Sequence, residues 1–350
     1  MQDSSQDIIE YLREAFFVRI PKSEQVTTSE LVSLVRSIKG FFSHVSYESL
    51  KGGVKIGLVD DCTSLGDSFV HIQSYTDLLR EYPVCDRDKE AVLVSDIKNS
   101  SEYFLYDCDA ESVVSSAILY YEMTKENKEY ICFGSKRLLL SPPPGYGSFF
   151  TRFDFKRLEE LLNEYHNHNA RRSTCKILER CWYDEKRFYL RAQPEEYMRD
   201  SLLQFLRNTL GKYADVTPER NTDDSHPVDL NIDYRGSNRL AIIEVKWLGD
   251  SVNDDGKSTT NYRDARANEG ARQLNNYLED TNDYNPKQEI IGVLVVFDAR
   301  RKGLKSSRNP TKDDLFFYRR TNISYKVEYD KVRHDFSRPV RFYMEPKLTV

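Results

Sequence analysis

The chain lacks the features that mark membrane proteins and secreted proteins. Its longest apolar run, residues 290–297, is far shorter than the roughly 20 residues that a membrane-spanning helix needs. Residues 1–7 are acidic and polar, whereas a secretory signal begins with basic residues and continues with apolar ones. We therefore expect a cytoplasmic protein that does not contact a membrane.

Cysteine is sparse, and its spacing excludes the common zinc modules. All six cysteines precede residue 190, and none of them belongs to a Cys-x-x-Cys pair. Cys175 and Cys181 stand near His166 and His168 in the sequence, but these spacings match no familiar zinc site. We expect the cysteines to be reduced thiols with a structural role.

The first 150 residues contain no glycine-rich loop that would bind phosphate and no internal repeat. Their hydrophobic spacing predicts helices at residues 7–17, 28–45 and 110–125, and strands at 54–59 and 91–95. These elements indicate a mixed α/β domain. Its role, as a sensor, a specificity module or an oligomerisation surface, stays open.

Proline and glycine mark the end of this domain. Residues 141–147 read Ser-Pro-Pro-Pro-Gly-Tyr-Gly, which no regular helix or strand accommodates. A length of 350 residues suits two domains. We assign residues 1–150 to the N-terminal domain, 151–193 to a connection with a helix at 154–165 and a hairpin at 176–190, and 194–350 to a C-terminal domain with a basic end.

Two short apolar segments carry the most informative charged residues. Asp229 lies in the first segment, residues 226–233, and Glu244 and Lys246 lie in the second, residues 241–247. Side chains alternate between the two faces of a strand, so Glu244 and Lys246 point to the same face. If the two strands are neighbours, two acids and a lysine converge.

Such a group has a recognisable chemistry. Two carboxylates on neighbouring strands can hold Mg²⁺, which prefers oxygen ligands and also accepts phosphate oxygens. A lysine beside them can polarise the attacking water or neutralise the charge that builds on phosphorus. The pattern predicts phosphodiester hydrolysis. The competing interpretation is structural: Asp229 on the polar face of a half-exposed hairpin, with Glu244 and Lys246 as a cross-strand ion pair.

A similar triplet occurs in the N-terminal half. Asp96-Ile97-Lys98 follows the apolar residues 91–94, but the acids upstream of it, Asp86 and Asp88, lie in a charged, turn-like stretch. We interpret this triplet as the solvated end of a strand.

The segments around Glu244 form a complete sequence of elements. Residues 194–210 predict a helix that starts at a proline followed by acids and stops at Gly211. Alternation and turn residues then predict three antiparallel strands at 213–220, 228–234 and 240–248. A second helix at 265–280 and a buried strand at 289–297 complete the order αβββαβ.

With these motifs, residues from about 194 to 300 resemble the PD-(D/E)XK nuclease superfamily, over less than a third of the chain. The resemblance implies a restriction-endonuclease-like αβββαβ core, with a mixed sheet flanked by helices. The whole chain would be an α/β (α+β) protein with a separate mixed α/β domain in front. One departure is the residue between Pro227 and Asp229, which are adjacent in the motif.

The resemblance also implies roles for individual residues. Asp229, Glu244 and the backbone carbonyl of Val245 would bind Mg²⁺ or Mn²⁺, and Lys246 would be catalytic. On the first helix, Glu196 is favoured over Glu195 because it stands three residues before Arg199. Gln273 would be a catalytic residue on the second helix. Two of these residues also have a structural interpretation. Glu196 can be a favourable charge in the first turn of its helix, and Gln273 can lie on a solvated helix face.

The C-terminal segment is basic. Residues 300–347 carry eight arginines and six lysines against four aspartates and two glutamates, whereas the whole chain has a net charge of −5. Such cations suit contacts with a phosphate backbone. For the aromatic residues Phe316 and Tyr318 we favour a place in a sheet over base stacking. The nucleic-acid-binding candidates are Arg300, Arg301, Lys302, Lys305, Arg319 and Arg320.

Residues 249–264 are polar and aperiodic, and they predict a long loop that closes over substrate or becomes ordered when DNA binds. The sequence as a whole predicts a metal-dependent endonuclease, with double-stranded DNA as the first substrate. By resemblance, such a chain fits prokaryotic defence against phage or foreign DNA, as a homodimer or with a partner subunit. The alternative is a nucleic-acid-binding or scaffold subunit with a nuclease fold that is inactive, or active only with a partner or signal.

Overall fold

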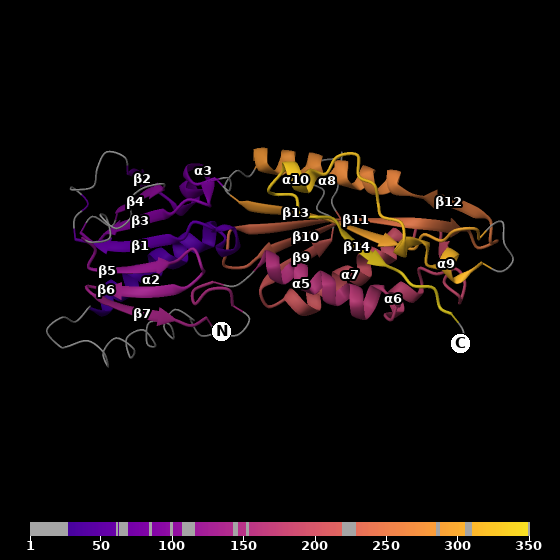
Figure 1. The fold of residues 1–350 in the computed structure, drawn as a ribbon, viewed down its shortest axis with the longest axis horizontal. Helices are drawn as coiled ribbons and strands as arrows, with labels where there is room; N and C mark the ends of the chain where they lie inside the picture. The colour runs from indigo at the N-terminus through magenta and orange to yellow at the C-terminus, as the bar shows by residue number, and fades with distance from the viewer. Residues whose placement is uncertain are drawn as a thin grey trace. The chain divides into compact units, whose positions relative to one another are not determined.

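The computed structural model describes residues 27–60, 62, 69–83, 86–98, 101–106, 116–142, 146–151, 154–218, 229–284, 288–304 and 310–348. The chain divides into two compact units (Figure 1). Unit 1 comprises Met1–Phe153 with the short segments Gly236–Asn238 and Pro286–Glu289, and unit 2 comprises Asp154–Arg235, Arg239–Asn285 and Ile290–Val350.

Unit 1 contains a mixed seven-stranded sheet in the order β2-β4-β3-β1-β5-β6-β7, in which β1 and β3 are parallel. Helix α2 (Thr28–His44) is N-capped by Thr27, whose side chain forms a capping box with Glu30. Its apolar side chains join a core with alternate residues of the sheet. The elements are η2 (Tyr47–Ser49), β1 (Val54–Val59), β2 (Val70–Ile72), η4 (Tyr75–Asp77), α3 (Leu78–Glu81), β3 (Ala91–Asp96), β4 (Ser101–Tyr106), β5 (Leu119–Met123), β6 (Glu129–Phe133) and β7 (Lys136–Leu140).

Most sequence predictions for unit 1 that fall on described residues are confirmed. The helix at 28–45 and the strands at 54–59 and 91–95 correspond to α2, β1 and β3. The helix predicted at 110–125 is wrong where residues 119–123 form β5. There, Leu119, Tyr121 and Met123 are buried while the residues between them are partly exposed, which is the period of a strand. Residues 7–17 and 110–115 lie outside the described part of the chain.

Unit 2 contains a second mixed sheet in the order β14-β13-β11-β10-β9, and β8 and β12 also pair with β11. Its first elements are α5 (Phe155–Tyr165), the π-helix η6 (His166–Ala170), α6 (Lys176–Glu179), β8 (Leu190–Arg191), α7 (Glu195–Leu210), β9 (Ala214–Pro218) and β10 (Leu230–Tyr234). The others are β11 (Arg239–Val252), β12 (Ser258–Tyr262), α8 (Asp264–Tyr284), β13 (Glu289–Asp298), α9 (Lys312–Leu315), η7 (Phe317–Arg319), α10 (Tyr329–Val332) and β14 (Val340–Tyr343).

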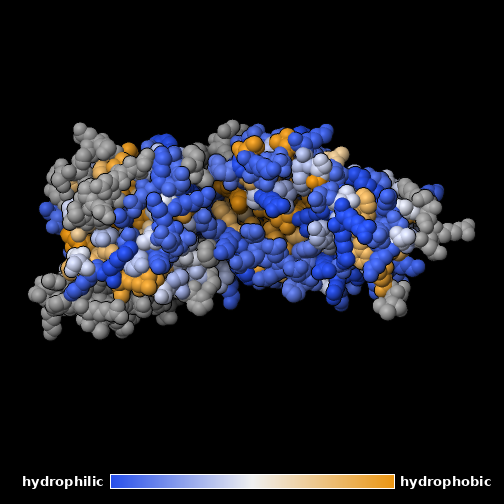
Figure 2. Space-filling model, viewed as in Figure 1, coloured by the Kyte–Doolittle hydropathy of each residue, from blue (hydrophilic) through white to orange (hydrophobic). Residues whose placement is uncertain are grey.

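The two faces of β11 pack against different helices. Ile243 and Val245 belong to a core that contains side chains of α5 and α7, whereas Ile242 and Leu248 belong to a core with α8. In Figure 1, α8 runs along one side of this sheet, and α5 and α7 lie on the other. Figure 2 shows hydrophobic residues between the hydrophilic outer surfaces of these layers.

The helices and strands predicted between residues 194 and 300 are present in the predicted order, and α5 lies where a helix was predicted. The loop predicted at 249–264 is wrong, because β11 continues to Val252 and turns through Gly256, at φ +74°, into β12. The hairpin predicted at 176–190 is present only in part, since the segment begins with the short helix α6 and an antiparallel bridge then joins Trp182 to Leu190. Phe316 and Tyr318 lie at the 3₁₀-helix η7 rather than in a sheet.

None of the helices in the described part of the chain is long and apolar enough to cross a membrane.

Candidate active site

Asp229 and Glu244 lie opposite each other on adjacent strands. Leu230 of β10 pairs with Ile243 of β11, so extending this antiparallel register by one residue sets Asp229 against Glu244. The carboxylate Oδ2 of Asp229 accepts a hydrogen bond of 2.8 Å from the backbone N–H of Val245. Both acids therefore face the α8 side of the sheet, as the sequence pattern predicts for two neighbouring strands.

Lys246 points to the same face, where it contacts Glu244 and interacts electrostatically with Asp229. Its ammonium Nζ donates to Glu244 Oε1 and, at 3.2 Å, to the carbonyl oxygen of Val245. Glu244 and Lys246 are each 4 % exposed. Burying an ion pair costs desolvation energy that apolar residues of similar size would not incur. The buried pair therefore costs stability that apolar residues at these two positions would not cost.

A glycine on α8 makes room for this pair. A Cβ atom added to Gly270 would lie 2.5 Å from Lys246 Cγ and 3.0 Å from Leu294 Cδ1, both closer than a normal contact. The absence of a side chain at residue 270 therefore lets α8 cross directly over Lys246.

Replacing Gly270 with alanine is expected to displace the Lys246 side chain and lower the activity proposed below. A misplacement of about 1 Å at a reacting group costs about 10²-fold in rate. Alanine normally stabilises a helix interior by about 1 kcal/mol relative to glycine. A thermal melt of G270A together with a cleavage assay separates the two effects, and full activity in G270A would contradict this role for the glycine.

The acid that α7 contributes is Glu195 and not Glu196. Glu195 Oε1 lies 3.6 Å from Lys246 Nζ, whereas Glu196 is exposed to solvent. Successive helical residues are separated by about 100° around the axis, so only one of the two can face the sheet. The sequence favoured Glu196, which lies outside this cluster, because the spacing to Arg199 does not determine which helix face is buried.

Two arginines complete the charged surroundings. Arg199, one turn after Glu195 on the same helix face, lies with its NH1 3.7 Å from Asp229 Oδ1. Arg266 of α8 donates to both carboxylate oxygens of Glu195, at 3.1 and 3.2 Å, and to Glu269 at 2.9 Å. Sequence reasoning missed both roles, although the four-residue spacing from Glu195 to Arg199 was a usable signal.

Glu195→Gln is expected to lower cleavage by about 10- to 100-fold, as loss of a supporting partner does in other sites. The Glu195 carboxylate is one of the groups that raise the pKa of Lys246. Its removal should therefore move the alkaline limb of the pH–rate profile to lower pH. Glu196→Gln is the matched control, one residue away and exposed, and it should change neither rate nor profile. Equal effects of the two substitutions would rule out a specific role for Glu195.

Burial and neighbouring charges shift the ionisation of all three central groups. Burial raises the pKa of Glu244 to about 7, against the lowering effect of Lys246. Burial likewise raises the pKa of Asp229, again opposed by Lys246. For Lys246 burial acts to lower the pKa, but the acids, Glu244 first, raise it above its ordinary value. The site therefore has carboxylates that bind protons readily and a lysine that stays charged.

Two amide side chains lie near these groups. The Oε1 atom of Gln273, three residues after Gly270 on α8, is enclosed by protein and has no hydrogen-bond partner. Asn231 of β10, two residues after Asp229, is 5 % exposed, and its Nδ2 atom also has no partner. Gln273 was predicted from the sequence and Asn231 was not, although alternation along the strand puts Asn231 on the same face as Asp229.

The oxygen atoms that could hold a divalent cation are those of Asp229, Glu244 and the carbonyl of Val245. Over the residues for which the structure gives positions, no three histidine, cysteine, aspartate or glutamate side chains are grouped to hold a metal ion. The set is therefore two carboxylates and one backbone carbonyl, a purely oxygen-based set of the kind that Mg²⁺ and Mn²⁺ accept.

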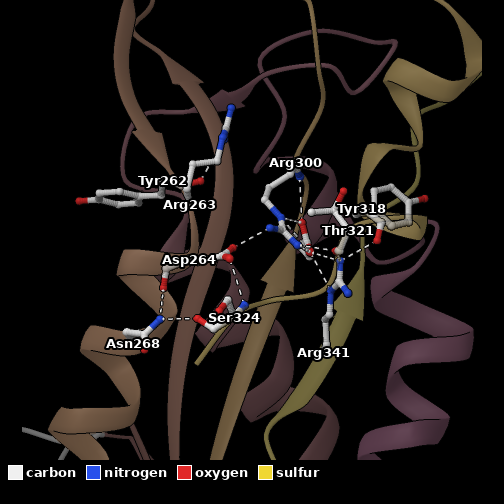
Figure 3. Close-up of polar contacts among 10 residues, drawn as sticks. Tyr262, Arg263, Asp264, Asn268, Arg300, Tyr318, Thr321, Ser324 and Arg341 are labelled. Carbon is white, nitrogen blue, oxygen red and sulfur yellow. Dashed lines mark hydrogen bonds and ion pairs between the residues drawn. The ribbon is translucent and has the colours of Figure 1, made fainter. Parts of the chain in front are cut away.

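Two of the predicted nucleic-acid contacts are wrong, because their side chains are internal. Arg300 is 2 % exposed and pairs with Asp298 at 2.8 Å. It also pairs with Asp264 at 2.7 Å (Figure 3). Arg301 is 3 % exposed, donates to the carbonyl oxygen of Met344 at 2.6 Å, and has its pKa lowered by burial to about 10.

The guanidinium of Arg300 also holds the chain that follows η7. It donates to the carbonyl oxygen of Thr321, and Asp264 accepts from the backbone N–H of Ser324 (Figure 3). Arg341 donates to the same Thr321 oxygen and to that of Tyr318. These arginines therefore bind backbone carbonyls and acids of the protein itself.

The remaining basic candidates differ in their surroundings. Arg319 pairs with Glu345 at 2.9 Å, and Arg320 pairs with Asp313 at 3.0 Å. Lys302 is exposed. Lys305 lies outside the described residues. The cationic surface that can meet a phosphate backbone is therefore smaller than the charge count of the segment predicts.

Comparison with protein-family models, curated proteins and solved structures finds no match for this chain. The function proposed next rests on the chain's own residues and on the resemblance of its motifs.

Proposed function

We propose that unit 2 is a metal-dependent nuclease of the PD-(D/E)XK type, which hydrolyses phosphodiester bonds in nucleic acid. One observation carries the proposal: Asp229, Glu244 and Lys246 converge on one sheet face, where two charged side chains are almost fully buried. Strongly perturbed ionisable groups of this kind cluster at functional sites. A purely structural strand with apolar residues at 244 and 246 would often be as stable or more stable.

The donor set fits a hard divalent cation. Asp229, Glu244 and the Val245 carbonyl would hold Mg²⁺ or Mn²⁺. Because desolvation raises both carboxylate pKa values, a cation that binds at low pH must displace a proton. When bound, such a metal lowers the pKa of a water and polarises a phosphate oxygen.

Lys246 has the role that follows from its charge and position. Its ammonium would orient the attacking water and offset the negative charge that develops on the phosphate. Glu195, itself held by Arg266, supports Lys246 from the α7 side. Arg199 beside Asp229 limits the motion of that carboxylate.

Double-stranded DNA is the proposed substrate, with RNA and branched DNA as alternatives. Among the described residues of the predicted set, exposed Lys302 and the ion-paired Arg319 and Arg320 remain for backbone contacts. By resemblance alone, the setting would be defence against phage or foreign DNA. Cleavage of both strands would favour a homodimer.

The test is incubation of the full chain with supercoiled plasmid, linear duplex, single-stranded DNA and RNA, each with Mg²⁺, Mn²⁺ or EDTA. Cleavage with metal and none with EDTA supports the proposal and identifies the substrate. A folded protein that binds nucleic acid and never cleaves it supports the alternative, a binding or scaffold subunit. One observation favours the form of that alternative in which the protein is active only with a partner. The Glu244 carboxylate is already engaged in an ion pair with Lys246.

A further inference from the structure

Two buried atoms beside the site have unmet hydrogen-bonding capacity. Asn231 Nδ2 is a donor and Gln273 Oε1 is an acceptor, and neither has a partner. Buried polar groups without partners are uncommon in folded proteins, and each needs an explanation such as a bound water, an ion or a catalytic role. A donor and an acceptor at one site point to a single ligand that can serve both.

The strand register and the helix period bring these residues to the same side of the site. Asn231 pairs with Ile242 of β11, which belongs to the same core as Leu274 of α8. Gln273 precedes Leu274 and follows Gly270 by about one turn, on the part of α8 that covers Lys246. Asn231 approaches from the strand and Gln273 from the helix, on the face that carries Glu244.

A water molecule satisfies both atoms at once. Its oxygen accepts from the Asn231 amide, and one of its hydrogens is donated to Gln273 Oε1. Buried waters typically make about three hydrogen bonds to polar groups that would otherwise be unsatisfied. A charged acceptor on this face is Glu244, whose Oε1 accepts from Lys246.

We propose that Asn231 and Gln273 hold an ordered water that donates to the carboxylate of Glu244. Asn231 is then a positioning residue, which fixes Glu244 through this water. That the positioned carboxylate binds a metal rests on the function proposed above. The water itself does not depend on that function, because its partners belong to the metal-free protein.

The first test is a high-resolution crystal structure of the metal-free full chain. A water within hydrogen-bond distance of Asn231 Nδ2, Gln273 Oε1 and Glu244 is the expected result. Its absence, or a direct hydrogen bond between the two amides, would overturn the proposal whatever the protein does with metal. A protein that has this water and binds no metal would instead contradict only the proposed function.

The second test uses Asn231→Leu, which has a similar volume and no hydrogen-bonding groups. The melting temperature of the metal-free variant should fall only slightly, because the variant loses one hydrogen bond to the water and no direct hydrogen bond within the protein. The dissociation constant for Mn²⁺ should increase by about 10- to 100-fold, as for other residues that orient a metal ligand.

Asn275→Leu is the matched control. Asn275 is also buried, but its Nδ2 donates to Glu279 and its Oδ1 accepts from Arg333. This variant should melt at a lower temperature and bind Mn²⁺ as the wild type does. If Asn231→Leu instead behaves like Asn275→Leu, the Asn231 amide has a structural role alone and the positioning role is wrong.

Discussion

Replacement of Lys246 by alanine is expected to lower metal-dependent cleavage by about 10²- to 10⁴-fold, the range for loss of a group that assists proton transfer or charge neutralisation. The reason is its position, since its ammonium contacts both Glu244 and the Val245 carbonyl. The measurement is the single-turnover rate of plasmid cleavage, with a thermal melt of each variant. Because K246A leaves Glu244 buried and unpaired, we also expect Glu244 to take up a proton.

Lys98→Ala is the matched control for this prediction. Lys98 belongs to the similar triplet Asp96-Ile97-Lys98, but it is exposed, and Asp96 accepts from the backbone N–H of Cys62. Its removal should leave the cleavage rate unchanged. Wild-type cleavage by a folded Lys246→Ala protein would remove Lys246 from the mechanism.

Metal affinity is expected to rise by about 100-fold between about pH 5 and about pH 7 and then to level off. The affinity rises with pH because burial raises the pKa of Glu244 to about 7. Below this pH the carboxyl is protonated, and a cation must displace that proton. Each pH unit below this pKa costs about tenfold in affinity for one proton displaced. A glutamate with the ordinary pKa of about 4.3 would give a flat response over the same range.

Titration of Mn²⁺ at several pH values measures this dependence. Glu244→Gln is the control, and it should bind Mn²⁺ weakly at every pH, with the pH dependence from Glu244 removed. Affinity that is independent of pH between about 5 and 7 in the wild type would show that Glu244 is not a ligand with a raised pKa.

The convergence of Asp229, Glu244 and Lys246 could be predicted because it depends on local rules. Strand alternation sets the face of each side chain, and a short turn forces neighbouring antiparallel strands. The choice between Glu195 and Glu196 could not be made this way. It depends on which face of α7 packs on the sheet, and that is set by tertiary contacts of the whole helix.

The basic segment shows a second limit of sequence reasoning. A charge count over residues 300–347 omits Asp264 and Asp298, which lie outside that segment and neutralise Arg300 in the fold. Arg341 pairs with the same Asp298. The net charge of a segment describes its electrostatic potential only when the segment is isolated. Whether its arginines are exposed in the fold depends on acidic partners that are distant in the sequence.

The local sequence pattern also led to wrong predictions for two strands. Residues 119–123 carry apolar side chains that fit both a helix and a strand in a short window, and pairing with β1 and β6 decides for the strand. The polar segment that contains β12 has no apolar alternation, and its pairing with the end of β11 orders it as a hairpin. In both cases pairing with a neighbouring strand determines the strand conformation, which the local sequence alone does not specify.

The central claim is that the Asp229–Glu244 pair holds the metal on which cleavage depends. The most direct measurement is bound Mn²⁺, counted by electron paramagnetic resonance, together with plasmid nicking on the same samples of wild type and of the Asp229→Asn/Glu244→Gln double variant. We predict that nicking by the wild type rises with bound Mn²⁺ and that the double variant loses both. Nicking that persists in the double variant, or a wild type that nicks DNA without binding Mn²⁺, would contradict the claim.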